Sequence, residues 1–209
     1  MSNIKTRFLS GITLGGITLF AILYSQVLLN LLLILIGSLM LYEWRQITQK
    51  NENYLHLGLI IIIIPILSLY LVSLKPEGRI ALLTYALIIA AVDTFAMFGG
   101  KTFKGAKLAP TISPNKTWSG LASGSIAGAI TSLLISFMIH EYNVRYSHIE
   151  FFFFGLIIGI IEQCSDLFIS FFKRKFSVKD SGYIIPGHGG VLDRFDGIIL
   201  TAPILLWIL

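Results

Sequence analysis

The chain has 209 residues, of which 55% are hydrophobic and only 13% are charged. Soluble domains contain about 25% charged residues, so this composition excludes an ordinary soluble domain and predicts an integral membrane protein. The net charge of +5 is of the kind seen in nucleic-acid-binding proteins. The basic residues lie between apolar stretches, however, where they set membrane topology, so no nucleic-acid partner is expected.

Several apolar stretches are long enough to cross the roughly 30 Å hydrocarbon core of a bilayer as α-helices. We therefore expect an all-α integral membrane protein, a polytopic bundle of about seven transmembrane helices that forms one catalytic domain over residues 1–209. The expected spans lie near residues 8–24, 27–42, 55–74, 80–98, 118–139, 151–172 and 191–209.

The first two spans are separated only by Ser25 and Gln26. As one helix, residues 8–42 would measure about 52 Å, which is longer than the membrane is thick, so a tight hairpin is favoured. The apolar run follows Lys5 as in a signal peptide, but no small-residue cleavage site comes after it, and we expect an uncleaved span. Pro65 should kink the third span.

The fifth span begins with Gly120, Gly124 and Gly128, which lie four residues apart and predict close packing against a neighbouring helix. A homodimer formed through this helix is a hypothesis. The last apolar run, residues 198–209, would reach only about 18 Å as a helix. A seventh span must therefore begin near Val191, which places the acidic residues just after it at the membrane border.

The positive-inside rule supports this layout. With the N-terminus in the cytoplasm, the inner segments carry 13 of the 16 lysines and arginines. The two polar loops at residues 99–117 and 173–190 then face the cytoplasm, where nucleotides are found. Cys164 is the chain's single cysteine, so an intramolecular disulfide is excluded.

Chemically active side chains are concentrated between Asp166 and Gly197, in the sequence DLFISFFKRKFSVKDSGYIIPGHGGVLDRFDG. On a helix, Asp166 and Ser170 lie one turn apart on one face, and Asp193 and Asp196 share a face at a spacing of three residues. Carboxylates, cations and glycine backbone thus meet at a membrane border. This combination favours a magnesium-bound polyphosphate, because oxygen ligands hold the metal while basic groups neutralise phosphate.

This stretch resembles the C-terminal signature of phosphatidate cytidylyltransferases, also called CDP-diacylglycerol synthases. The matching positions are Ser170, Lys173, Arg174, Lys179, Asp180, Gly182, Pro186, His188, Gly189, Gly190, Asp193, Arg194 and Asp196. Residues 112–118, with Asp93 and Gly99 upstream, resemble a second motif of that family.

The resemblance implies transfer of a cytidylyl group from CTP to phosphatidate in a lipid membrane, with Mg²⁺ and with a second cation left open. It assigns metal binding to Asp166, Asp193, Asp196 and, more weakly, Asp93. Neutralisation of the phosphates falls to Lys173, Arg174, Lys179 and Arg194, with Asp180 orienting a lysine or joining the metal shell and His188 donating to phosphate or closing the site. The implied substrate contacts are Ser113, Asn115, Lys116, Thr117, Ser170, Gly189 and Gly190.

Two alternatives stay open. A sister enzyme that acts on another lipid phosphate would carry similar motifs. A small ion transporter would explain the intramembrane acids Asp93, Glu162 and Asp166, since such residues often mark ion pathways. The acids gather at one membrane face and no inverted repeat is visible, which favours the enzyme. We expect it in the bacterial cytoplasmic (inner) membrane, with N-terminus and active site on the cytoplasmic side.

Overall fold

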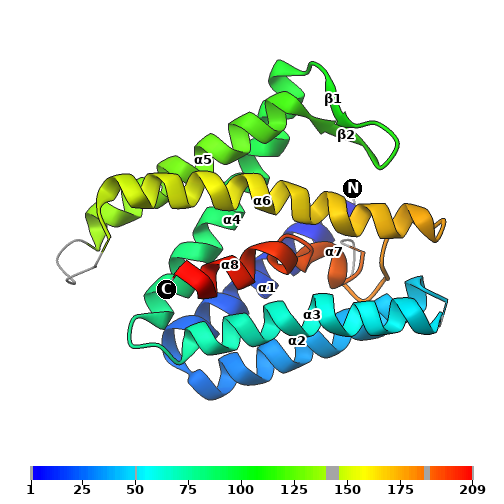
Figure 1. Ribbon diagram of the computed structural model, residues 1–209, viewed down its shortest axis with the longest axis horizontal. Coiled ribbons are helices and arrows are strands. Elements are labelled where there is room, and N and C mark those ends of the chain that lie inside the picture. The colour runs from blue at the N-terminus through cyan, green and yellow to red at the C-terminus, as the bar shows by residue number, and fades with distance from the viewer. Residues whose placement is uncertain (1, 50, 140–145, 186–188, 209) are drawn as a thin grey trace. The chain divides into compact units, whose positions relative to one another are not determined.

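The computed structural model describes residues 2–49, 51–139, 146–185 and 189–208. The chain forms two compact units, which we call unit 1 (Met1–Leu83 with Ile169–Leu209) and unit 2 (Thr84–Phe168). The elements, labelled in Figure 1, are α1 (Ser2–Tyr24), α2 (Gln26–Ile47), α3 (Glu52–Ser73), α4 (Gly78–Phe103), β1 (Lys107–Ala109), β2 (Ser113–Thr117), α5 (Trp118–Met138), α6 (His148–Lys175), α7 (Leu192–Phe195) and α8 (Ile198–Ile208).

The protein is mainly helical, as the composition predicts. Within the described residues, five helices, α2 to α6, are long and apolar enough to cross a membrane. Two further apolar helices, Thr13–Tyr24 and Ile198–Ile208, are shorter. The helical membrane class is therefore confirmed, whereas the expected number of about seven spans stays a prediction.

The tight hairpin expected near Ser25 is confirmed. Ser25 has an extended backbone (φ −145°, ψ 110°), and its hydroxyl accepts a hydrogen bond from the Leu28 amide at 3.2 Å. Ser25 is thus the N-cap of α2, and it separates α2 from α1 because a capping serine satisfies an otherwise unpaired donor at the helix start. Pro65 lies inside α3, which continues across it.

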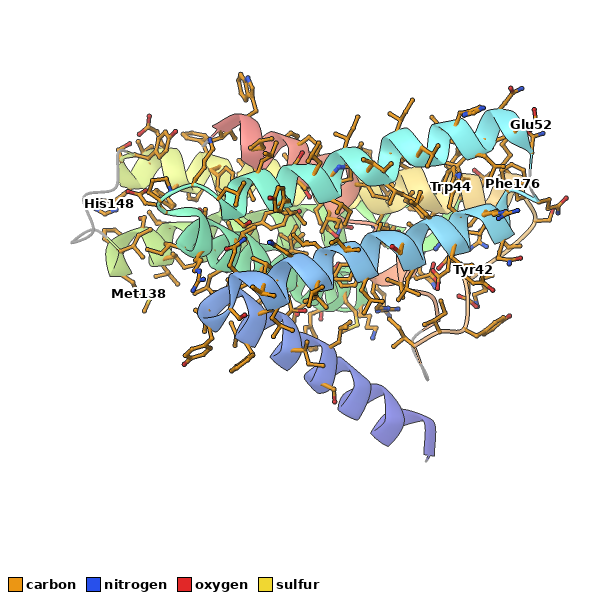
Figure 2. The ribbon with its side chains drawn as sticks, turned by 90° about the horizontal axis from the view of Figure 1, so that it is seen from below. Tyr42, Trp44, Glu52, Met138, His148 and Phe176 are labelled. Atoms are coloured by element: carbon orange, nitrogen blue, oxygen red, sulfur yellow. The ribbon has the colours of Figure 1, made fainter. Side chains whose placement is uncertain are left out.

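In unit 1, α2 and α3 run side by side, and α8 packs against α3 (Figure 1). The second span is expected to end near residue 42, but α2 continues to Ile47. The reason is local packing: the Trp44 indole donates to the Tyr54 carbonyl at 2.7 Å and its ring meets Phe172 at 5.1 Å. Figure 2 shows Trp44 at the end of the unit where α3 begins.

In unit 2, α4 extends to Phe103, beyond the expected end of the fourth span at residue 98. The loop expected over residues 99–117 is only partly a loop, because β1 and β2 form an antiparallel hairpin (Figure 1). Its pairing joins Lys107 to Thr117 and Ala109 to Ser113. The apolar patterns that reveal spans carry little information on so short a hairpin, which is held by backbone pairing.

The close packing predicted for the glycines of α5 is confirmed. A Cβ atom added at Gly120 would lie 2.8 Å from the Ala96 carbonyl oxygen, and one at Gly124 would lie 2.9 Å from that of Val92, both on α4. One at Gly128 would lie 2.8 Å from the Gly155 carbonyl oxygen on α6. These glycines pack helices within the chain, and the hypothesis of a homodimer is untested.

The C-terminal segment differs from the single span expected over residues 191–209. It consists of the four-residue α7 and the longer α8, with a turn at Asp196 and Gly197 between them. The Asp196 carboxylate accepts the Gly197 amide at 2.9 Å. A local side-chain bond of this kind competes with continuous helical hydrogen bonding, which explains the turn.

Candidate active site

The C-terminal end of α6 supplies a lysine and leads into the glycine-rich loop. Ser177 has a positive φ of 57°, the Ser177 amide donates to the Arg174 carbonyl at 3.0 Å, and the Val178 amide donates to the Lys173 carbonyl at 2.9 Å. This pattern is a Schellman-type helix end. It satisfies the last carbonyls of α6 and turns the chain sharply, so the loop starts at a defined position relative to Lys173.

Lys173 and Asp193 form a buried ion pair in unit 1. The Lys173 ammonium lies 2.7 Å from Asp193 Oδ1, and the two side chains are only 9% and 8% exposed. The other oxygen, Oδ2, accepts the Ser181 amide at 2.8 Å and the Gly190 amide at 3.1 Å. Asp193 therefore ties α6, the loop and α7 together.

The charge state of Asp193 follows from these contacts. It lies on α7, outside the helices long enough to span a membrane. Burial acts to raise its pKa, but the hydrogen bond and charge of Lys173, with the two backbone donors, outweigh burial and hold the pKa below the ordinary 3.8. Asp193 is consequently an anion at neutral pH.

Glu43 is a second carboxylate that holds the same loop, and it is not among the site residues predicted from the sequence. It is 2% exposed on α2. Its Oε1 accepts the Val191 amide at 2.9 Å, while Oε2 accepts the Ser181 hydroxyl and the Leu192 amide, each at 2.8 Å. The only signal in the sequence is an acid at the end of an apolar span, which requires a partner.

Gly182 and Gly190 allow the loop backbone to approach the Glu43 carboxylate closely. A Cβ atom added at Gly182 would lie 2.7 Å from Glu43 Oε1, and one at Gly190 would collide with the Ser181 hydroxyl and the Glu43 carboxylate. Gly189 has a φ of +86°, a conformation that favours glycine. The glycines thus let the loop backbone reach buried carboxylates.

The other predicted site residues of unit 1 are more open. The Arg174 guanidinium donates to the Val178 carbonyl at 3.0 Å. Lys179, Asp180 and Arg194 are exposed, Asp196 is half-buried and Ser170 is buried. His188 lies outside the described residues. Exposed cations and one half-buried acid near a buried ion pair suit a site that receives a charged ligand.

Unit 2 contains a second cluster of charges, around Lys116 on β2. The Lys116 ammonium lies 2.6 Å from Asp166 Oδ2 and donates to the Gln163 side-chain oxygen at 3.1 Å. Gln163 in turn donates to Glu162 at 2.7 Å, and Glu162 also interacts with Asp93. The structure therefore brings together Lys116, Asp166 and Asp93, three predicted site residues, through Gln163 and Glu162.

The remaining predicted contacts lie on the hairpin around Lys116. The pairing of β2 with β1 is irregular, because Lys107 and Ala109, two positions apart, face Thr117 and Ser113, four positions apart. Ser113 and Lys116 are half-buried. Asn115 is exposed. Thr117 is buried and accepts the Gly120 amide at 3.1 Å as the N-cap of α5. Its hydroxyl therefore has a structural role, and the substrate contact expected of Thr117 stays a prediction.

The fit of a metal ion follows from the donor set. Over residues 2–49, 51–139, 146–185 and 189–208, no three His, Cys, Asp or Glu side chains are grouped so that they could hold one. Magnesium in nucleotide enzymes uses one or two carboxylates and completes its shell with phosphate and water. Each unit supplies such acids, and those less enclosed than Asp193 are Asp166 and Asp196.

A groove of about 500 Å³ lies between α2 and α3 in unit 1. Its lining is mainly aliphatic, with Asn30, Ser38 and Tyr70 as polar members. None of its lining residues belongs to the two charged clusters. The groove suits hydrocarbon and offers no charged group for a nucleotide.

The fold and the clusters define a polytopic membrane protein whose lysine and carboxylate groups suit phosphate chemistry. A model of the cytidylyltransferase family matches residues 49–209. The chain therefore belongs to this family.

Individual relatives match nearly the whole chain. It is 51% identical to a Rickettsia prowazekii (strain Madrid E) protein and 53% identical to a Rickettsia felis protein, each over 99% of this chain and 92% of the relative. A Brucella abortus biovar 1 protein is 29% identical over 98% of this chain and 93% of its own length. All three are named phosphatidate cytidylyltransferase.

Proposed function

We propose that this protein is a phosphatidate cytidylyltransferase, which transfers CMP from CTP to phosphatidate and produces CDP-diacylglycerol and pyrophosphate. The proposal is carried by the buried Lys173–Asp193 pair, held by a glycine-rich loop within the part of the chain that the cytidylyltransferase family model matches. The names of relatives that cover almost the whole chain support the same activity.

The chemistry accounts for the kinds of residue present. An oxygen of the phosphatidate phosphate attacks the α-phosphorus of CTP, and the bond to the bridging oxygen breaks as pyrophosphate leaves. The nucleophile is already an anion, so the site has little need of a strong base. Its work is to hold two anions together and to stabilise the charge on the leaving group.

Cationic side chains perform this work in our proposal. The phosphates are neutralised by Lys173, Arg174, Lys179 and Arg194. Lys116, which is paired with Asp166 in the structure, releases Asp166 and binds a phosphate oxygen in its place. A lysine can make this exchange because its ammonium is a compact charge on a flexible stem. Asp193 orients Lys173, which it contacts at 2.7 Å.

Magnesium is part of the proposal. In each unit the predicted acids would hold it together with substrate phosphate, Asp166 and Asp93 in unit 2 and Asp196 and Asp193 in unit 1. When bound, it would supply positive charge for the developing pyrophosphate.

The membrane setting fits the two substrates. We propose the bacterial inner membrane, with the N-terminus and both clusters on the cytoplasmic side, because 13 of the 16 basic residues then face inward. CTP would arrive from the cytoplasm, while phosphatidate would keep its chains among membrane lipids.

The test is incorporation of phosphorus label from the α-position of CTP into lipid by purified protein. Phosphatidate in mixed micelles is the substrate, assayed with Mg²⁺ and separately with excess chelator. Asp166→Asn and Asp193→Asn are the test variants. Glu52→Gln is the control, because Glu52 is exposed at the start of α3.

We expect the wild-type protein and Glu52→Gln to produce labelled CDP-diacylglycerol. The label should be absent with chelator and in both aspartate variants. A panel of other lipid phosphates tests the sister activity. If folded wild-type protein labels none of them, the proposal fails, and ion-flux measurement in vesicles becomes the next experiment.

A further inference from the structure

Glu43 is a buried charged side chain that has no part in the proposed reaction. It lies near the C-terminal end of α2 and is 2% exposed. Its carboxylate accepts a hydrogen bond from the hydroxyl of Ser181, which is 138 residues away along the chain. Burying a carboxylate costs several kcal/mol unless hydrogen bonds compensate. Three donors compensate here, and all belong to the loop and the start of α7.

Glu43 and Asp193 both accept hydrogen bonds from Ser181 and from the backbone of residues 190–192. The Ser181 hydroxyl donates a hydrogen bond to Glu43, and the Ser181 amide donates one to Asp193. The Gly190 amide donates to Asp193, and the next two amides, those of Val191 and Leu192, donate to Glu43. The two carboxylates thus divide four backbone donors and one hydroxyl, and neither can shift without moving the donors of the other.

We propose that Glu43 is a positioning residue for the cytidylyl transfer. It fixes Ser181 and residues 190–192, and so holds Asp193 against Lys173 in the geometry that binds the nucleotide phosphates. The inference rests on the proposed function. Glu43 acts through the loop, and its substitution changes substrate binding and turnover rather than folding alone.

The substitution Glu43→Gln tests the proposal because it keeps size and shape. Glutamine offers one oxygen and one NH₂ group. In one orientation the NH₂ group faces the Val191 amide, and in the other it faces the Leu192 amide. Either way one backbone donor meets another donor, and the loop loses a contact. Ser181→Ala is milder, because it removes one hydroxyl and leaves every backbone donor in place.

Kinetics separate positioning from a purely structural role. We expect Glu43→Gln to lower kcat/KM for CTP by about 10- to 100-fold, the usual effect of losing a group that orients a functional side chain, with a raised KM. Ser181→Ala should lower it by about fivefold, the effect of one hydrogen bond. Glu52→Gln, the same change at an exposed position, should match the wild type.

Hydrogen exchange tests the geometry without reference to activity. The amides of Val191 and Leu192 should exchange at least about tenfold faster in Glu43→Gln than in the wild type, because each opening becomes easier by roughly one hydrogen bond or more. The amides of α5, in unit 2, should be unchanged. Mass spectrometry of fragments that cover residues 189–195 measures this.

Each result decides the matter. If Glu43→Gln lowers kcat in proportion to a reduced folded fraction and leaves KM for CTP unchanged, Glu43 only stabilises the protein and the proposal fails. Unchanged exchange of the amides of residues 191 and 192 would also overturn it. If Glu43→Gln does not fold, Ser181→Ala must raise KM and speed exchange, or the proposal fails. If the wild type is inactive, the proposed function fails, and exchange alone decides whether Glu43 holds the loop.

Discussion

The Asp193→Asn substitution tests the physical reasoning about the buried ion pair. The Lys173 and Asp193 side chains are 9% and 8% exposed and their charged atoms lie 2.7 Å apart. Asparagine has nearly the same shape but no charge, so Lys173 would stay buried without its counter-charge. The amide group would also point its NH₂ either at Lys173 or at the amides of Ser181 and Gly190.

The expected loss follows from this geometry. Removing one partner of a buried pair costs about 3–5 kcal/mol, because the other charge is left uncompensated. For a chain of this size, each kcal/mol lowers the melting temperature by about 2–4 °C, so we expect a decrease of about 10 °C. Asp180→Asn, an exposed change in the same loop, should shift stability by less than about 0.5 kcal/mol.

Thermal unfolding in detergent micelles, followed by tryptophan fluorescence, measures the effect. The chain has three tryptophans, and Trp44 packs on Phe172 beside the site. The double variant with Lys173→Met should recover much of the lost stability, because both charges are then absent. Equal stability of Asp193→Asn and wild type, or a double variant that loses the sum of the single effects, would refute the reasoning.

Three further predictions concern separate features. Lys116→Gln should reduce transferase activity at least about tenfold. It should cost less than about 1 kcal/mol of stability, since its ion pair is partly exposed. Lys75→Gln serves as the activity control, and equal activity of the two variants would contradict the phosphate-binding role of Lys116. Gly128→Ala should lower stability by about 1–3 kcal/mol in unfolding experiments, because the new methyl group has no room, whereas Gly16→Ala, with open space, should not. Because the pKa of Asp193 is lowered from 3.8, its ion pair stabilises the protein fully above about pH 4 and less as the pH falls through the lowered pKa. The stability difference between wild type and Asp193→Asn should therefore be constant from pH 7 to about 4 and shrink below it, and a difference that grows on acidification would be the opposite of this expectation.

The helices and the reactive stretch were predictable from the sequence. A membrane span must satisfy its backbone internally and present apolar side chains, so α2 to α6 appear as long apolar runs and Ser25 as the break before them. The glycine spacing in α5 predicted close packing for an equally local reason, since only small residues let helices approach closely. The acids and cations between Asp166 and Gly197 were identifiable from residue type and spacing.

The partners of those residues were not predictable from the sequence. Lys116 and Asp166 were assigned different roles, and Lys173 and Asp193 are paired across 20 positions. Such pairs depend on where helices and loops meet, and local patterns do not specify this. The hairpin of β1 and β2 was missed for a similar reason, because backbone hydrogen bonds leave little trace in hydropathy.

Glu43 shows the division between the two kinds of information. Its sequence neighbours mark the end of an apolar helix, which is a matter of hydropathy and chain length. Its function depends on Ser181, Val191 and Leu192, more than 100 residues away along the chain. Hydropathy locates a span because each residue meets lipid independently of the rest of the fold, whereas a buried carboxylate acquires its role from the donors that folding brings to it.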